Sequence, residues 1–502
     1  MATVPDGTLM QRAATGLAKH CVHQLSEANV AIAGSTVVLL IGSGDNGGDA
    51  LWAGAILAKQ GANVTAIQLA DKCHADGERA LCLAGGHVEI VDLVRHVAAI
   101  DDADLVIDGI VGIGGAGALR SPAAALAAAA TASHACVIAV DLPSGIDADT
   151  GAVADPTAVI TADITVTFGC IKTGLVSMPG STHVGNLRLV DIGLAEVLPA
   201  MPDVFVVDRY DVVRATPMPG PTDDKYTRGV VGVVAGSAAY PGAAVLCSGS
   251  ARLGGTGMVR YAGSAADHVV AEWPDVVASG GGPAEAGKVQ SWVVGPGGGT
   301  DHESRNRFVE ALQSPAVVVL DADALTVLAK DDEMRGLIRE RNARRQPTVL
   351  TPHSGEFARL GFELGSGEKE DRIAVLRNAA AEMQAVILLK GSCTLIATPE
   401  GTVVANNHSS SALATAGSGD VLAGLIGSML ASATARLTST EGEATSAALA
   451  LDNDAVAQLV GASAWLHGEA GTLAAQGGRP VTATDVLDSL SDAIAYARTI
   501  DV

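Results

Sequence analysis

Short runs of apolar, often β-branched residues recur along the 502-residue chain and predict buried parallel strands. In the first half these runs lie at residues 36–41, 64–69, 105–108, 136–141 and 164–168. In the second half they lie at residues 230–235, 317–320, 348–350 and 386–389. Apolar residues at helical spacing precede or separate these runs, for example at residues 9–25, 51–60 and 123–132. This alternation predicts an α/β protein with doubly wound sheets.

Proline residues are concentrated near the middle of the chain and mark a domain boundary. They stand at positions 199, 202, 217, 219 and 221, and the polar residues 222–225 follow them. Because proline interrupts both helices and strands, we place the boundary near residue 205. The predicted domains are therefore residues 1–205 and 206–502, each long enough to bury a core of its own.

Charge and cysteine usage exclude several classes of function. The formal net charge is −23 with only 32 Lys and Arg residues, so a nucleic acid or an anionic membrane surface is not an expected partner. No uninterrupted apolar stretch reaches the roughly 20 residues of a membrane span. The seven cysteines are scattered and form no C-x-x-C pair, which predicts reduced thiols and a cytoplasmic protein.

Polar loops follow several predicted strands of the first half. A glycine-rich loop at residues 42–49 contains Asn46, and Asp108, Asp141 and Ser144 come at or just after later strand ends. Ligands of open α/β sheets bind at the carboxyl ends of strands, so these side chains are expected to converge on one crevice. Their oxygen atoms suit a hard cation. The alternative is that each Asp only forms a turn or caps a helix.

The second half ends its predicted strands in the same way. His353 and Lys390 follow two of them, and Gly417-Ser418-Gly419-Asp420 opens a long apolar helix. Unpaired N–H groups and the positive dipole end make such a helix start an anion site beside one carboxylate, an arrangement suited to phosphoryl transfer. The alternatives are helix capping by the Ser-Gly-Asp residues and by His353, and a solvated surface position for Lys390.

The first half resembles the NAD(P)H-hydrate epimerase family. The resemblance rests on residues 42–49, the Asp108 strand end, Asp141-Leu142-Pro143-Ser144-Gly145, and residues 165–169 with Lys172. It implies a Rossmann-like domain that binds potassium through Asn46, Asp108 and Ser144. Asp141 and Lys172 are the expected catalytic residues. The resemblance further implies that the hydrated nicotinamide dinucleotide is held by Asp45, Asn46, Gly47, Gly48, Asp49, Gly112, Ile113, Gly114, Gly115, Ala116, Gly117, Ala118 and Asp141.

The second half resembles the ADP-dependent NAD(P)H-hydrate dehydratase branch of the ribokinase-like superfamily. The match covers residues 225–430 and the stretch around Trp465 to Ala470. It implies a ribokinase-like α/β sandwich in which Asp420 is catalytic. The implied substrate contacts are Ala243, Gly297, His353 and Asp420. The implied contacts to ADP, which is used with Mg²⁺, are Lys390, Gly391, Ser392, Cys393, Thr394 and Gly419.

The two resemblances together predict a bifunctional metabolite-repair enzyme, an isomerase joined to a lyase. The expected partners are the small molecules NADHX, NADPHX and ADP, together with a second copy of the chain in a homo-oligomer. Two departures from the families' usual patterns stand out: Asp45 precedes Asn46 where two Asn are usual, and Ser418 stands where Thr is more frequent. The alternatives are a ribokinase-like small-molecule kinase fused to a dinucleotide-binding domain, and a non-catalytic NAD(P)-sensing protein.

Overall fold

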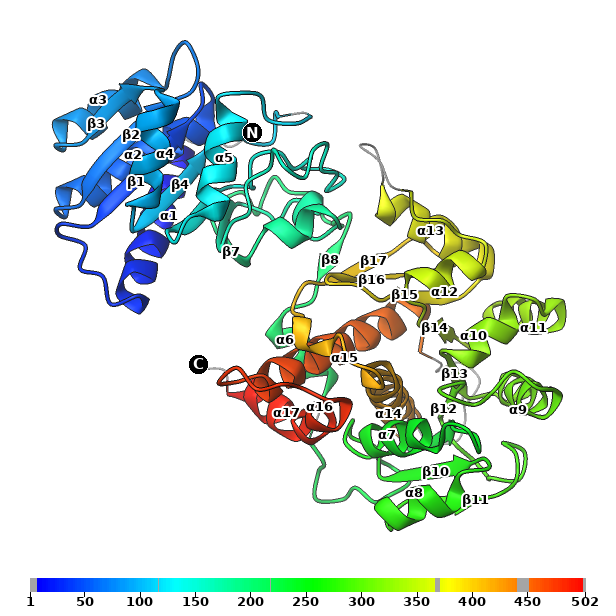
Figure 1. Cartoon of the computed structure of the whole chain (residues 1–502). Helices are drawn as coiled ribbons and strands as arrows, with labels where there is room; N and C mark the ends of the chain where they lie inside the picture. The colour runs from blue at the N-terminus through cyan, green and yellow to red at the C-terminus, as the bar shows by residue number, and fades with distance from the viewer. Residues whose placement is uncertain (1–6, 116, 217, 366–370, 440–450, 500–502) are drawn as a thin grey trace. The chain divides into compact units, whose positions relative to one another are not determined.

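A computed structural model describes residues 7–115, 117–216, 218–365, 371–439 and 451–499. The chain divides into two compact units whose sequences meet between Pro202 and Asp203 (Figure 1). The boundary predicted near residue 205 lies three residues further on, at a short strand, β8 (Phe205–Val206), which pairs with the sheet of the second unit. Each unit has its own sheet, so the predicted α/β class is confirmed.

In the described part of the first unit, seven parallel strands form one sheet in the order β3-β2-β1-β4-β5-β6-β7. The first six of these positions follow the Rossmann order, in which the chain changes direction between β1 and β4. The strands are β1 (Thr36–Ile41), β2 (Asn63–Gln68), β3 (His87–Ile90), β4 (Leu105–Gly109), β5 (Cys136–Val140), β6 (Ile164–Phe168) and β7 (Asn186–Val190).

Alternate side chains of these strands pack into two separate apolar cores, one on each face of the sheet. Val37 and Leu39 point to the core beneath the helices α1, α2 and α3, whereas Val38 and Leu40 point to the core beneath α4 and α5. Helices on both faces explain why the strand sequences are apolar without interruption. The helices are α1 (Thr8–Glu27), α2 (Asp45–Lys59), α3 (Ala75–Leu83), α4 (Leu93–Asp101) and α5 (Ala123–Ala132).

Helix α2 begins earlier than the sequence pattern predicts. The pattern indicates a loop at residues 45–49 and a helix from residue 51, but α2 starts at Asp45, and Asn46 and Asp49 lie in its first turns. The glycines allow this early start because they let the helix approach the neighbouring backbone closely. A Cβ on Gly47 would lie 2.5 Å from the Gly42 carbonyl oxygen. The predicted loop residues therefore sit at a helix N-terminus, directly above the strand ends.

The second unit is built on a larger mixed sheet. Its described strands lie in the order β11-β10-β9-β12-β13-β14-β15-β16-β17-β8, and pairing is parallel except around β16. The central strands are β9 (Val230–Val234), β12 (Ser291–Val294), β13 (Val317–Leu320), β14 (Thr348–Leu350) and β15 (Val386–Leu389). The outer strands are β10 (Met258–Ala262), β11 (Val277–Ser279), β16 (Thr394–Ala397) and β17 (Val403–Asn406).

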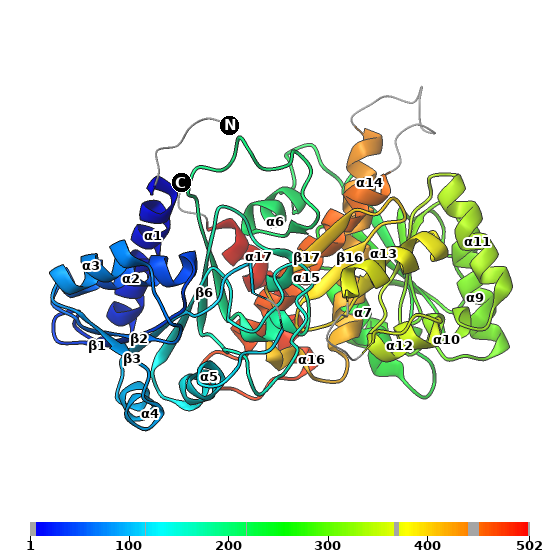
Figure 2. The same ribbon diagram turned by 90° about the horizontal axis from the view of Figure 1, so that it is seen from above.

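Two groups of helices cover the faces of this second sheet. One face packs against α6 (Arg209–Ala215), α7 (Pro241–Ala251), α8 (Ala266–Glu272), α14 (Ser418–Ser439), α15 (Asn453–Ala474), α16 (Ala483–Asp488) and α17 (Leu490–Arg498). The other described helices of this unit are α9 (His302–Gln313), α10 (Asp323–Leu328), α11 (Asp332–Ala343), α12 (Ser354–Arg359) and α13 (Arg372–Met383). Helices α9 and α11 lie side by side at one end of this unit (Figure 2).

Helix α14 is the one described helix that is long and apolar enough to cross a membrane. Its residues 418–437 have a mean hydropathy of 1.2, and 72% of this apolar stretch is buried inside the protein. The helix packs against α7, α15 and the central strands, where Val421, Leu425 and Ile426 are fully buried. Burial within the unit accounts for its apolar composition, so α14 is a core helix.

Candidate functional sites

Asn46, Asp108 and Ser144 meet at the carboxyl edge of the first sheet, as predicted. The Asn46 Nδ2 group donates hydrogen bonds to the carbonyl oxygens of Val140, at 2.6 Å, and Val111, at 3.1 Å. Asp108 is fully buried and accepts bonds from the Ser144 hydroxyl at 2.7 Å and from the Ser144 N–H at 2.8 Å. These contacts tie α2 and the ends of β4 and β5 into one cluster.

This cluster fits the hard-cation site expected from the sequence. Oxygen atoms of Asn46, Asp108 and Ser144 gather in it, and oxygen is the donor that alkali and alkaline-earth cations prefer. Burial raises the pKa of Asp108 to about 6, although the Ser144 hydrogen bonds lower it. A Cβ on Gly112 would lie 2.6 Å from the Asn46 Oδ1 atom. Glycine at this position therefore leaves the amide oxygen open to a ligand.

Asp141 and Lys172 form an ion pair beside this cluster. Lys172 Nζ donates to Asp141 Oδ1 and also to the Thr167 hydroxyl, at 3.1 Å, and the Phe168 carbonyl, at 3.0 Å. The two charged side chains are only 9% and 14% exposed. Asp141 adopts a left-handed backbone with φ of 68°, a conformation that Asp and Asn tolerate best after glycine. The strand-to-turn transition thus holds a buried acid and a largely buried cation together.

Asp49 is a third buried carboxyl of this edge, after Asp108 and Asp141. It is 7% exposed, and its buried Oδ1 atom has no hydrogen-bond partner among the residues that the structure describes. Burial, together with the charges of Asp141 and Asp45, raises the pKa of Asp49 to about 8, so this group is largely protonated at neutral pH. Asp45 differs from Asp49 because its side chain is exposed. The helix start therefore offers one buried, neutral carboxyl and one carboxyl in contact with solvent.

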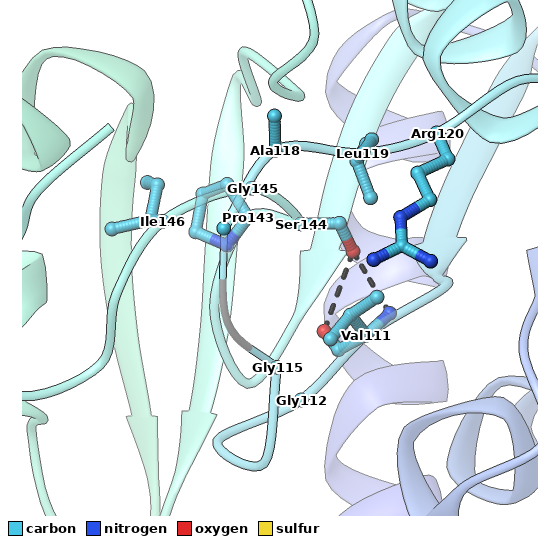
Figure 3. A pocket seen from close by; sticks show the side chains of 11 residues that line it. Val111, Gly112, Gly115, Ala118, Leu119, Arg120, Pro143, Ser144, Gly145 and Ile146 are labelled. Atoms are coloured by element: carbon cyan, nitrogen blue, oxygen red, sulfur yellow. Dashed lines mark hydrogen bonds between the residues drawn. The ribbon is translucent and has the colours of Figure 1, made fainter. Parts of the chain in front are cut away.

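A cavity of about 310 Å³ opens beside the cluster (Figure 3). Gly112, Gly115, Gly117 and Ala118 line it, whereas Ile113 and Gly114 are exposed on the same loop and Ala116 lies outside the described residues. The opposite wall is formed by residues 143–146, including Ser144, whose hydroxyl accepts a hydrogen bond from the Val111 N–H at 3.0 Å. Arg120, which no sequence motif singles out, also lines this cavity.

In the second unit, Lys390 forms a largely buried ion pair at the end of β15. Its Nζ lies 2.6 Å from Oδ1 of Asp321, which follows β13, and the Thr351 hydroxyl donates to the same oxygen at 2.8 Å. Asp321 is 1% exposed, and the Lys390 side chain is 23% exposed. The alternative of a solvated surface lysine is therefore wrong. Lys390 also approaches the start of α14, because a Cβ on Gly419 would lie 3.5 Å from Nζ.

Asp420 lies in the first turn of α14, next to this pair. Burial raises its pKa to about 7; the charges of Asp321 and Asp323 act in the same direction, and Lys390 acts against them. A carboxyl with a pKa near neutrality is suited to accept a proton in catalysis. The Ser418 hydroxyl donates to the Leu413 carbonyl at 2.7 Å, which anchors the start of the helix to the preceding turn.

A larger cavity, of about 480 Å³, lies between the β15 end and the start of α14. Five of the residues predicted to contact the nucleotide line it, together with His353: these are Lys390, Gly391, Ser392, Thr394 and Gly419. Cys393 does not line it, and its side chain is only 5% exposed. The remaining walls are Asn406, Ser409, Ser410, Ser411, Leu413, Ala414, Ser418, Leu422, Ala464 and His467.

Ala243 and Gly297 lie together but outside the lining of that cavity. Gly297 has a positive φ of 56°, and a Cβ there would lie 2.7 Å from the Ala243 Cβ. The small residues therefore allow two segments to touch. His353 is 55% exposed at the cavity and also caps α12 in a reciprocal capping box with Glu356. The capping alternative for His353 is thus realised, and the residue nevertheless lines the predicted site.

Two further residues of this region have strong structural signatures, although the sequence does not single out either of them as a site residue. His467 on α15 lines the cavity and is 6% exposed, and its Nε2 atom has no hydrogen-bond partner in the described part of the chain. Burial lowers its pKa to about 4, so the ring is neutral at pH 7. His408 stacks on Trp465 with ring centroids 4.3 Å apart, and its Nε2 lies 2.6 Å from Glu469. This contact fixes the loop that carries Ser409 to the cavity wall.

Two regions of the chain match known protein families. A family model described as YjeF-related protein N-terminus matches residues 6–174, and a second, described as NAD(P)H-hydrate dehydratase, matches residues 231–492. The bifunctional NAD(P)H-hydrate repair enzyme Nnr of Mycobacterium tuberculosis is 48% identical to the chain over 433 residues, which cover 86% of each protein. The chain belongs to the bifunctional NAD(P)H-hydrate repair enzyme family.

Other members of the repair enzyme family match over similar lengths. The Nnr enzyme of Corynebacterium glutamicum is 35% identical over 524 residues, which cover 92% of the chain and 89% of that protein. The chain also resembles a solved structure, the ADP/ATP-dependent NAD(P)H-hydrate dehydratase of Bacillus subtilis co-crystallised with ATP and Mg²⁺. That structure is 25% identical with a TM-score of 0.47, and the match covers 59% of this chain and all of that one.

Each matched region of this repair enzyme contains one of the two sites. Residues 6–174 include Asn46, Asp141 and Lys172, and residues 231–492 include Lys390 and Asp420. Both resemblances drawn from the motifs are therefore confirmed at the level of the family. The roles of the individual residues are proposals that rest on their geometry.

Proposed function

We propose that this member of the repair enzyme family restores hydrated NADH and NADPH, with the first unit as epimerase and the second as ADP-dependent dehydratase. The observation that carries the proposal is Asp420, a half-buried carboxyl with a pKa near 7, which lies beside Lys390 and next to Gly419, both of which line the cavity of about 480 Å³. The names of the relatives, which extend over both units, support the pairing of the two activities. Residues 1–205 would hold the epimerase and residues 206–502 the dehydratase.

In the dehydratase, Asp420 accepts the proton of the substrate's C6 hydroxyl. The hydroxyl oxygen attacks the terminal phosphorus of ADP, the bond from that phosphorus to the AMP oxygen breaks, and AMP leaves. Lys390 and the N–H groups around Gly419 stabilise the charge that develops on the phosphoryl oxygens. The C6–O bond then breaks with loss of a proton from C5, which releases phosphate and restores the dihydropyridine ring. Phosphate leaves readily, whereas hydroxide is a poor leaving group.

The groups proposed to contact ligands in this unit follow from the cavity. Lys390, Gly391, Ser392, Thr394 and Gly419 line it and are assigned to the adenine nucleotide. His353, at the same cavity, is assigned with Asp420, Ala243 and Gly297 to the hydrated dinucleotide. Cys393 contributes its backbone, since its side chain is buried. Mg²⁺ bound with the nucleotide would neutralise part of the phosphate charge.

In the epimerase, Asp141 and Lys172 assist ionisation at C6. The Lys172 ammonium group gives a proton to the C6 hydroxyl, which leaves as water. The ring nitrogen stabilises the cation that remains, and water adds again from either face and returns the proton to Lys172. The buried Asp141 carboxylate stabilises that cation, and Lys172 orients the carboxylate through their ion pair. Asn46, Asp108 and Ser144 would hold potassium, which would fix the substrate phosphates or the geometry of this edge.

We further assign the enzyme to the cytoplasm. No disulfide joins any of the seven cysteines in the described part of the chain, as expected for a protein in a reducing compartment. Self-association into a homo-oligomer stays a prediction, and light scattering of the purified protein tests it. The substrates are small molecules, and the charge of −23 disfavours binding of nucleic acids.

One assay tests the proposed function. The protein is incubated with a mixture of R and S NADH hydrate, ADP and Mg²⁺, and the recovery of dihydronicotinamide absorbance is followed. Recovery of both epimers supports two active units, and recovery of the S fraction alone would leave the epimerase assignment wrong. A ribokinase-like kinase would instead yield a phosphorylated metabolite and no reduced dinucleotide. Repeating the assay with ATP in place of ADP defines the nucleotide preference. Repeating it with NADPH hydrate in place of NADH hydrate defines the substrate preference.

A further inference from the structure

The cavity of the first unit has a single charged side chain among its described lining residues. This residue is Arg120, which ends the glycine-rich loop that forms one wall of the cavity. In Figure 3 its side chain lies beside Leu119 and Val111, across from the turn that contains Ser144. Gly112, Gly115 and Gly117 precede it on the same wall, and Gly117 has a left-handed backbone with φ of 76°. Glycines of this kind let a ligand approach the backbone closely, although the Gly115 N–H already donates to the Gly112 carbonyl oxygen at 2.9 Å.

The other charges at this sheet edge are negative or already neutralised. Asp45, Asp49, Asp108 and Asp141 gather there, and the cation of Lys172 is paired with Asp141. Arg120 is exposed and forms no ion pair within the described part of the chain. A hydrated dinucleotide carries two phosphate groups as NADHX and three as NADPHX. Such a ligand can approach this acidic edge only where a cation compensates its charge.

We propose that Arg120 binds a phosphate group of the hydrated dinucleotide, together with the backbone N–H groups of the glycine-rich loop. The proposal rests on the epimerase function proposed above and deepens it. A guanidinium group donates two parallel hydrogen bonds to phosphate, and the open glycine loop lets the ligand come within reach of the main chain.

The assignment also orients the substrate. Asn46 links the two regions, because its Nδ2 group bonds to Val111 on the cavity wall and to Val140, the residue before Asp141. With its phosphates at Arg120, the dinucleotide would direct its nicotinamide end toward the Asp141–Lys172 pair. Arg120 is thus expected to affect substrate binding, and Lys172 and Asp141 to affect turnover.

The kinetic test compares Arg120→Gln and Arg120→Lys with the control Arg79→Gln, an exposed arginine of α3 that does not line the cavity. Arg120→Gln should raise KM for epimerisation about tenfold with kcat nearly unchanged, since a charge-assisted phosphate contact is worth roughly that factor. Arg120→Lys should recover part of the loss. An equal effect on NADHX and NADPHX assigns the pyrophosphate, and an effect on NADPHX alone assigns the 2′-phosphate. An unchanged KM for both substrates overturns the proposal.

A binding measurement keeps the test independent of epimerase activity. Calorimetry with ADP-ribose, which has the pyrophosphate but no nicotinamide, should show a binding event in the wild-type protein that Arg120→Gln weakens about tenfold. Lys390→Ala identifies any second event at the other unit's cavity and should leave the first one unchanged. If the wild-type protein does not epimerise but this binding depends on Arg120, the epimerase assignment fails and the phosphate site stands. If ADP-ribose binds equally well to the wild-type protein and to Arg120→Gln, Arg120 does not bind the pyrophosphate.

Discussion

The ammonium group of Lys390 forms its ion pair with Asp321, at 2.6 Å, although Asp420 is the carboxyl proposed to act in catalysis. The Thr351 hydroxyl donates to the same Asp321 oxygen, so this buried carboxylate has two donors. Lys390 therefore only partly offsets the burial and the neighbouring negative charges that raise the pKa of Asp420 to about 7. This division of charge keeps one carboxylate fixed and leaves the other able to exchange a proton near neutral pH.

The pH dependence of dehydration should follow from this relationship. Asp420 acts as a base only when it is deprotonated, and its deprotonated fraction rises as pH increases through about 7. We therefore expect kcat/KM to rise between pH 6 and 8, on the order of one unit either side of that pKa, and then to level off. Stopped assays with S-NADHX at saturating ADP measure this profile. A flat profile across that range would contradict the role of Asp420.

The same pH experiment can be repeated with Asp321→Asn. This change should shift the rise of kcat/KM to lower pH. The change removes the larger of the two neighbouring negative charges that raise the pKa of Asp420, and it frees Lys390 to favour the carboxylate. A displacement of the acidic limb by roughly one pH unit is expected, as for loss of a nearby like charge. Asp323→Asn is the matched control and should give a smaller displacement in the same direction, because Asp323 contributes less. Displacement toward higher pH would refute this electrostatic account.

Loss of the Asp420 carboxylate should abolish most turnover but spare nucleotide binding. Asp420→Asn keeps the size of the side chain and removes the proton acceptor, so kcat should fall by about 10²- to 10⁴-fold. Binding of ADP, measured by calorimetry, should stay near the wild-type value, because Asp420 does not line the nucleotide cavity. Asp492→Asn, at an exposed position of α17, is the control. Turnover equal to wild type would exclude Asp420 as the base.

Part of this architecture could be predicted from the sequence, because buried parallel strands have continuous apolar runs. The strands at residues 36–41, 164–168, 317–320, 348–350 and 386–389 have the predicted bounds. The edge strands β3 and β7 escape such a prediction, since their side chains are half-buried or exposed and form no apolar run. The start of α2 is displaced from its predicted position because the glycines of residues 47–48 indicate a loop locally. Only the packing against Gly42 shows that the helix tolerates them.

The candidate sites could also be predicted only in part, because contacts between distant segments are not visible in the local sequence. Asn46, Asp108 and Ser144 could be chosen because each follows a predicted strand, and strand ends converge in this fold. Asp321 also follows a strand, but its pairing with Lys390 depends on the order of β13, β14 and β15 in the sheet. His467 lies in the stretch Trp465 to Ala470 that contributes to the second resemblance, but its apolar helix does not indicate that this side chain faces a cavity. Only the unpartnered ring nitrogen beside the cavity reveals its position.

The buried carboxyl of Asp49 should make the stability of the first unit depend on pH. Its pKa is about 8 in the folded chain, mainly through burial, against 3.8 as the ordinary value, so the folded state binds the proton more tightly. Stability is then highest below the unfolded pKa, decreases as pH rises toward 8, and levels off above that value. Asp49→Asn should remove this penalty and raise Tm by about a few degrees at pH 8, with a smaller gain at pH 5.

Differential scanning calorimetry at the two pH values checks the Asp49 prediction. Asp102→Asn, an exposed carboxyl at the end of α4, is the control and should change Tm little at either pH. A gain at pH 5 equal to the gain at pH 8 would mean that Asp49 is not protonated in the folded protein.

Gly112 should govern the response of the epimerase to potassium. A Cβ at this position would lie 2.6 Å from the Asn46 Oδ1 atom, so Gly112→Ala must displace the amide that is proposed to bind the cation. We expect the KCl concentration for half-maximal epimerase activity to rise by about tenfold, which corresponds to the loss of one good ligand contact. Gly114→Ala is a close control, since a Cβ on Gly114 would have no neighbouring atom within 4 Å. Equal KCl dependence in both variants would argue against a cation at Asn46.

The Asp141–Lys172 pair should control epimerisation without affecting dehydration. Asp141→Asn is preferable to Asp141→Ala, because Asn tolerates the φ of 68° that Ala would adopt only with strain. With a mixed R and S substrate, the variant should consume the S fraction at the wild-type rate and leave the R fraction largely intact, with at least a hundredfold slower conversion, on the order of a lost catalytic group. Lys172→Gln should act in the same direction. Thr167→Val removes only a hydroxyl that donates to Asp141 at 3.0 Å and should have a small effect. Consumption of the R fraction at the wild-type rate by Asp141→Asn would show that another group ionises C6.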